Sequence, residues 1–163
     1  MKAKVKEVVE LPNEVFLKEV EKLIAEGHDV TLRVRGVSMR PFLEDRRDKI
    51  VLTKTQNPKI GDAVLAEIEP GKYVFHRIVV IKGERVTLRG DGNISSAETC
   101  DLNDIVAVAK AFIRNGKNFT VEGMAWRCYS VLWPKCPLMR RVLLKLYRAC
   151  RKVGIFKKYR LGA

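Results

Sequence analysis

Short segments in which apolar and polar residues alternate fill most of the chain between Val30 and Val121. Turn-forming residues separate them, as in the Pro- and Gly-containing stretch 57–62 and in Asn115-Gly116, which is a strong hairpin signal. A side-chain period of two is typical of strands with one buried face, and about seven or eight such segments can be counted. The pattern therefore predicts a mainly β domain of antiparallel strands, either barrel-like or sandwiched.

Helical periodicity occurs on both sides of this domain. Apolar residues recur at helical spacing between Asn13, a candidate cap, and Gly27, a candidate stop. Pro137 begins a second amphipathic stretch with one apolar and one basic stripe. We therefore divide the 163 residues into a helical lead-in (1–29), the β domain (30–123) and a basic C-terminal helical appendage (124–163).

Basic charge is concentrated in this appendage. The formal net charge is +13, but the chain up to Glu122 carries 21 Lys and Arg residues against 19 acidic ones. The remaining residues include 11 Lys and Arg and no acidic residue. An anionic partner is therefore expected for the appendage rather than for the β domain.

The appendage helix has three possible locations. The first, which we favour, is that its apolar stripe packs on the β domain. The second is an anionic membrane surface, because basic residues beside tryptophan and leucine suit an interfacial helix. The third is nucleic acid or an acidic partner, and nucleic acid is the least expected because no recognised motif accompanies the charge. The apolar stripe consists of Leu138, Val142, Leu143, Leu146, Cys150 and Val153.

Cysteine and histidine usage argues against a bound metal. None of the four cysteines forms a Cys-x-x-Cys pair, and only two histidines are present, so we expect neither a metal nor another cofactor. Neither a signal peptide nor a membrane-spanning stretch is recognisable. We expect a cytoplasmic protein, with attachment to the inner face of the membrane as the alternative.

Ser38 and His76 are the residues best suited to chemistry. A serine needs an adjacent base to become a nucleophile, and imidazole titrates near neutrality. Asp91 follows at the end of the next predicted hairpin and can return beside His76, which would complete a serine, histidine and acid arrangement. Spacing alone leaves a second interpretation, in which Ser38 lies in an ordinary turn and His76 is a structural residue on an apolar strand.

Four short motifs strengthen the catalytic interpretation. Gly36-Val37-Ser38-Met39-Arg40-Pro41 resembles the Ser-Met-x-Pro box of type I signal peptidases and their relatives in the S24/S26 (LexA-like) serine peptidase superfamily. Three further boxes of that superfamily follow in its order, namely Gly61-Asp62-Ala63-Val64, His76-Arg77 and Gly90-Asp91-Gly92-Asn93. The resemblance covers roughly residues 34–108 and implies the LexA and signal peptidase type of antiparallel β domain.

The resemblance also implies roles for individual residues. Ser38 would be the nucleophile and His76 the general base, which places the chain in the Ser-His branch. Gly36, where some relatives carry a hydroxyl, would lie at the oxyanion side, and Met39 would wall the substrate cleft. Asp91 would orient the imidazole. Because Ala97 occupies the position of a further acid in some relatives, Glu98 and Asp101 remain alternatives to Asp91.

These expectations define two possible functions. The first is a serine endopeptidase that hydrolyses a peptide bond in a precursor or leader-type polypeptide. The alternative is a catalytically weak or inactive module of the same fold with a regulatory or binding role. The lead-in lacks the membrane anchor of signal peptidases and is too short for the helix-turn-helix domain of LexA-like repressors.

Overall fold

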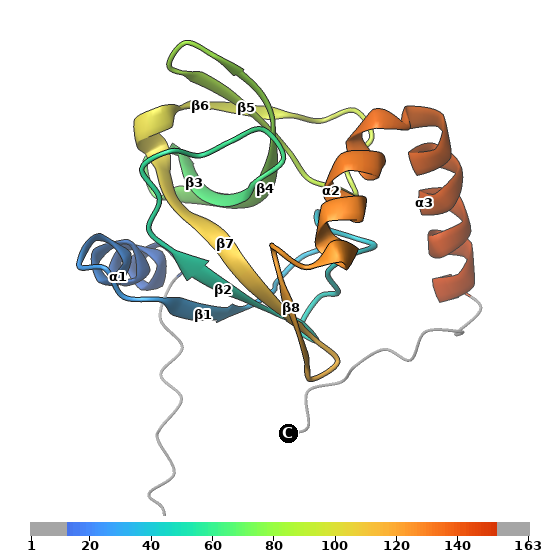
Figure 1. Ribbon diagram of the computed structural model, residues 1–163, viewed down its shortest axis with the longest axis horizontal. Coiled ribbons are helices and arrows are strands. Elements are labelled where there is room, and N and C mark those ends of the chain that lie inside the picture. The colour runs from blue at the N-terminus through green and yellow to red at the C-terminus, as the bar shows by residue number, and fades with distance from the viewer. Residues whose placement is uncertain (1–12, 153–163) are drawn as a thin grey trace, which may run out of the picture.

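The computed structural model describes residues 13–152, which form one curved antiparallel sheet with a helix at one side and two helices at the other (Figure 1). The elements are α1 (Asn13–Ala25), β1 (Val30–Arg33), β2 (Lys49–Thr53), β3 (Ala63–Glu69), β4 (Lys72–Lys82), β5 (Arg85–Arg89), β6 (Glu98–Asp101), a 3₁₀ turn (Leu102–Asp104), β7 (Ile105–Arg114), β8 (Lys117–Thr120), α2 (Met124–Lys135) and α3 (Pro137–Lys152). The mainly β fold with an N-terminal helix and C-terminal helical structure is therefore confirmed.

The sheet has the strand order β1-β2-β7-β3-β4-β5-β6, and β8 pairs with β7 outside this path. Every pairing is antiparallel. The long strand β7 joins the two halves, because it pairs with β2 through residues 108–113, with β3 through residues 105–108 and with β8 through residues 111–114. Asn115 and Gly116 connect β7 to β8 with φ values of 48° and 76°, the left-handed conformations that a two-residue hairpin turn requires.

Two hydrophobic clusters stabilise the sheet. The smaller one lies between β3, β4, β5 and β6 and includes Val64, Ile78 and Leu88. The larger one extends from α1 across β2 and β7 to the loop that contains Phe42. There Phe42 contacts Phe112 of β7 and Trp126 of α2, with ring centroids 5.2 and 4.9 Å apart. Helix α2 is thus part of the core of the β domain.

The expected packing of the apolar stripe on the β domain is wrong. Helix α3 instead buries Arg140 and Leu144 and turns Tyr147 inward, whereas Leu138, Val142, Leu143 and Leu146 are exposed. The inward face is held by hydrogen bonds from Arg140 and Tyr147 to residues far away in the sequence. A pattern of apolar residues within the helix cannot reveal such partners. Cys150 is half-buried, and Val153 lies outside the described residues.

Helix α2 is a second departure from expectation, since only a helix beginning at Pro137 was predicted. Its last turn contains Pro134, which obscured the helical pattern. None of the helices within residues 13–152 is long and apolar enough to span a membrane.

Candidate functional site

The loop that carries Ser38 lies directly against the glycine-rich loop after β5. The Gly92 N–H donates a hydrogen bond to the Ser38 carbonyl oxygen at 2.6 Å. A Cβ atom on Gly90 would lie 2.6 Å from that oxygen and 2.9 Å from the Ser38 Cβ, closer than side-chain and backbone atoms can approach. Gly90 therefore allows the Ser38 backbone to pack where a side chain would otherwise stand.

Strand pairing brings His76 to the same place. Arg77 of β4 pairs with Arg89 of β5, so His76 lies opposite Gly90 when the register is extended by one residue. Residues directly opposite each other in antiparallel strands project to the same face of the sheet. Ser38 occupies the direction in which a Gly90 side chain would point. Ser38 and His76 therefore both lie beside the end of β5, where the glycine-rich loop begins.

Ser38 is partly accessible, whereas the His76 ring is buried. Within residues 13–152, the Ser38 hydroxyl has no hydrogen-bond partner in this conformation. Hydrogen bonds between a catalytic hydroxyl and its base are often long or unformed before substrate binds, and they tighten in the complex.

Glu98 is the acid that contacts His76. The His76 Nδ1 atom lies 2.9 Å from Glu98 Oε2, and Glu98 is the first residue of β6. An Nδ1–H that donates to a carboxylate leaves Nε2 as the proton acceptor of a neutral imidazole. The arrangement thus supplies both the orientation and the tautomer that a general base needs.

Asp91, the acid predicted first, pairs with Arg77 instead. Two hydrogen bonds of 2.8 and 2.7 Å join its carboxylate to the Arg77 guanidinium, and both side chains are almost completely buried. Arg77 also donates to the Gly61 carbonyl at 2.7 Å and lies over the Trp126 ring at 4.6 Å. Although burial lowers the pKa of Arg77, the hydrogen bonds and charge of Asp91 raise it above its ordinary value.

Asp101, the other alternative, lies at the far end of β6. Its carboxylate forms an exposed ion pair with Arg85, 3.1 Å away. Of the three acids, the structure therefore brings only Glu98 into contact with the imidazole.

Gly36 and Met39 are placed differently from the roles that the resemblance implies. Gly36 has a φ of 91°, which favours glycine, and its N–H donates to the Asp45 carboxylate at 2.8 Å. That N–H is therefore engaged by Asp45 in this structure. Met39 is buried in the larger hydrophobic cluster, where it packs rather than forming an open cleft wall.

The C-terminal helices contact both loops of the site, which sequence patterns did not predict. Trp133 of α2 donates from its indole nitrogen to the Asp91 carbonyl at 2.9 Å. Tyr147 of α3 donates to Glu44, and Glu44 also pairs with Arg40, two residues after Ser38. A tryptophan before a proline and a tyrosine in a basic helix carry no local signal of such contacts.

Within the described residues, no group of His, Cys, Asp and Glu side chains could hold a metal ion. A model of the Peptidase S24-like family matches residues 2–119, which include Ser38, His76, Asp91 and Glu98. A comparison with curated proteins found no match.

Proposed function

This chain belongs to the Peptidase S24-like family, and we propose that it is a serine endopeptidase with Ser38 as nucleophile, His76 as general base and Glu98 as the acid that orients the base. One observation supports the proposal: Glu98 contacts His76 beside the end of β5, where Ser38 lies against Gly90. Three separate segments would thereby supply a nucleophile, a base and an orienting acid.

The proposed reaction uses each of these residues once in each half. Ser38 Oγ attacks the carbonyl carbon of the scissile peptide bond while His76 Nε2 accepts the hydroxyl proton. The Glu98 carboxylate stabilises the imidazolium through Nδ1–H. The backbone N–H of Ser38 is proposed to donate to the developing oxyanion. His76 then transfers its proton to the leaving amine, and water hydrolyses the acyl-enzyme by the same base in the second half of the reaction.

The proposed substrate is a precursor or leader-type polypeptide. Ser38 is only partly buried, and Val37 beside it is exposed, so an extended segment of another chain can reach the hydroxyl. This access supports the proposal of a polypeptide substrate.

Covalent labelling tests the nucleophile without knowledge of the substrate. A fluorophosphonate probe should label the full-length protein at Ser38, and Ser38→Ala should abolish this labelling. His76→Ala should slow it by ~10²–10⁴-fold, the usual contribution of a positioned base. Labelling that survives Ser38→Ala, or that is indifferent to His76→Ala, would contradict the proposal.

Substrates can then be sought by comparing the proteomes of cells carrying the unmodified protein and the Ser38→Ala variant. Precursor polypeptides should accumulate in the variant, with their uncleaved segments detected by mass spectrometry.

The alternative function is a regulatory or binding module without efficient catalysis. Two observations favour it: the Ser38 hydroxyl has no partner within residues 13–152, and the Gly36 N–H is engaged by Asp45. The same labelling experiment separates the two functions. A folded protein whose Ser38 reacts no faster than an ordinary surface serine would be the regulatory module.

A further inference from the structure

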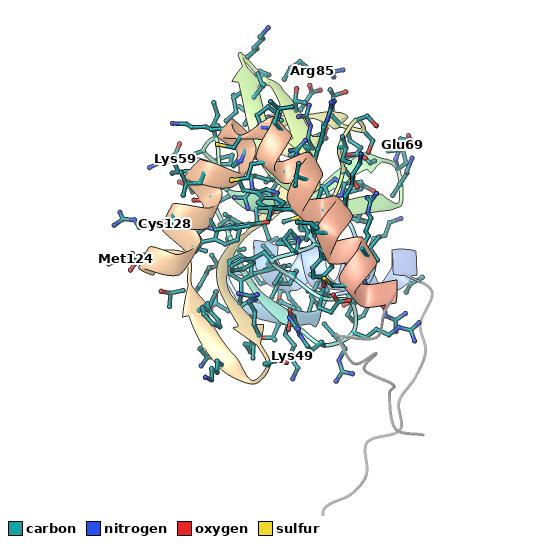
Figure 2. All side chains as sticks on the ribbon, turned by 90° about the vertical axis from the view of Figure 1, so that its right-hand side faces the viewer. Lys49, Lys59, Glu69, Arg85, Met124 and Cys128 are labelled. Atoms are coloured by element: carbon teal, nitrogen blue, oxygen red, sulfur yellow. The ribbon has the colours of Figure 1, made fainter. Side chains whose placement is uncertain are left out.

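Helix α3 presents an apolar surface to solvent. Leu138, Val142 and Leu146 follow one another at four-residue intervals, and 76%, 56% and 56% of their respective surfaces are exposed. Met139 and Leu143 widen this stripe by one row. Contiguous exposed apolar surface of this kind marks interaction sites, because isolated folded domains bury it. Figure 1 shows α3 at the side of the molecule beyond α2, and in Figure 2 this side faces the viewer.

The opposite side of α3 fixes this orientation. Leu144 is buried, Tyr147 donates to Glu44, and the Arg140 guanidinium donates to the Ile94 carbonyl at 3.3 Å. Rotating the helix to bury the apolar stripe would break both hydrogen bonds and expose Leu144. The stripe is therefore turned outward by specific contacts.

A row of cations adjoins the stripe. Arg141, Lys145 and Arg148 are exposed at helical spacing, one row away from Leu138 and Val142. No acidic residue follows Glu122 in the sequence, so nothing within this helix neutralises them.

We propose that this outer face of α3 docks on an anionic membrane surface. Its apolar residues would enter the boundary between headgroups and acyl chains, and the cationic row would contact anionic headgroups. The docking face consists of Leu138, Met139, Val142, Leu143 and Leu146 with Arg141, Lys145 and Arg148.

Charge and shape favour a bilayer over other occupants. A second copy of the chain would bring two cationic rows together, and like charges oppose such pairing. Nucleic acid would neutralise the cations but leave the five apolar side chains in water. An anionic bilayer accommodates both the stripe and the row. The proposal goes beyond the peptidase function and does not depend on it, since no residue of the docking face belongs to the Ser38 site.

Vesicle sedimentation with the full-length protein tests the proposal. We expect binding to vesicles of phosphatidylcholine with phosphatidylglycerol, weak binding to phosphatidylcholine alone, and loss of binding as salt rises. Replacing Arg141, Lys145 and Arg148 with Gln should weaken binding by about fivefold for each cation removed.

A matched pair of variants tests the apolar stripe. Leu143 on α3 and Leu23 on α1 are 41% and 40% exposed, and Figure 1 shows their helices on opposite sides of the molecule. Leu143→Glu should reduce vesicle binding at least tenfold, while Leu23→Glu should leave it unchanged. Leu138→Glu, at the most exposed position of the stripe, serves as a second variant, and thermal melting verifies that each protein is folded.

Three results would overturn the proposal. The apolar stripe would have no role in membrane binding if the folded Leu143→Glu and Leu138→Glu proteins bound vesicles as the unmodified protein does. Binding that is indifferent to phosphatidylglycerol would exclude charge complementarity. A concentration-dependent dimer abolished by Leu143→Glu, without vesicle binding, would assign the face to a second copy.

Discussion

Arg77, the residue after His76, forms a buried bidentate ion pair with Asp91. The pair ties β4 to the glycine-rich loop that supports Ser38, and Trp133 covers the loop from outside. Asp91 is thereby committed to holding the site together. Glu98 begins β6, two strands away from β4 in the sheet, and is the acid in contact with His76.

This division of labour predicts distinct effects for the three candidate acids. Glu98→Gln should slow fluorophosphonate labelling of Ser38 by about 10²-fold or more, because the imidazole loses the carboxylate that orients and stabilises it. Its stability should change little, since Glu98 is partly exposed. Asp101→Asn, in an exposed pair with Arg85, is the control and should label at the unmodified rate. Equal labelling rates for Glu98→Gln and Asp101→Asn would show that Glu98 has no such role.

Removing the Arg77 charge should destabilise the whole protein. Arg77→Met leaves Asp91 buried without its partner, and uncompensated buried charges of this kind cost about 3–5 kcal/mol of unfolding free energy. The exposed pair offers a matched control, because Arg85→Met removes a surface interaction worth only about 0–1 kcal/mol. Chemical denaturation measures both. A double variant, Arg77→Met with Asp91→Leu, should recover part of the loss, whereas no recovery would mean that Arg77 acts mainly through Gly61 and Trp126.

Gly90→Ala should disturb the site through contact with the Ser38 backbone. The added methyl group would lie 2.6 Å from the Ser38 carbonyl oxygen, so the loop must move, at a cost of about 1–3 kcal/mol. We expect slower labelling of Ser38 together with a lower midpoint of unfolding. Gly123→Ala is a milder control, since its added methyl group would lie 3.1 Å from the nearest atom, the Thr120 carbonyl oxygen. Unimpaired labelling of Gly90→Ala would show that Ser38 does not depend on this close approach.

The Tyr147 hydroxyl should hold α3 against the Ser38 loop. Tyr147→Phe removes its hydrogen bond to the Glu44 carboxylate, and a bond to a charged group contributes about 1.5–3 kcal/mol. Hydrogen exchange should therefore accelerate in residues 137–152. Tyr73→Phe is the matched control, because it removes a hydroxyl bonded to Glu21 of α1 at 3.0 Å and should leave α3 unchanged. If α3 were equally protected from hydrogen exchange in both variants, its other contacts would be enough to hold it in place.

Cysteine alkylation reports the packing of the smaller cluster. Burial, together with the nearby carboxylates of Asp104 and Asp101, raises the pKa of the Cys100 thiol to about 11. Since the thiolate is the reactive form, iodoacetamide at pH 8 should modify the exposed Cys128 first. The rate at Cys100 should keep increasing up to about pH 11. Rapid modification of Cys100 at pH 8, located by mass spectrometry, would mean that β6 opens in solution.

Much of the β domain could be predicted from the sequence, because strand alternation and turn chemistry are local. The Asn115-Gly116 hairpin and the β4–β5 pair were identified in this way. Strand β6 was not predicted, because it is only four residues long and most of them are polar. Since β6 carries Glu98, that omission left the choice of acid open. The decision between Asp91 and Glu98 depends on strand register and on Arg77, which only the folded chain brings together.

Amphipathicity was informative about helix α3 but not about its orientation. A stripe pattern shows that one side of a helix is apolar, yet it does not identify what covers that side. Here Arg140 and Tyr147 secure the inward face through partners far away in the sequence, Ile94 and Glu44. Long-range polar contacts of this kind leave no periodic signal.

The aromatic contact between Phe42 and Trp126 bears on how this protein can be dissected. The family match ends at residue 119, whereas contacts that support the Ser38 loop extend to Tyr147. A fragment that ends at residue 119 would expose Phe42 and Phe112 to water. It would also remove the indole N–H that donates to the Asp91 carbonyl. The shortest piece suitable for expression and crystallisation therefore reaches past Tyr147, and the family boundary is a poor guide to where the chain can be cut.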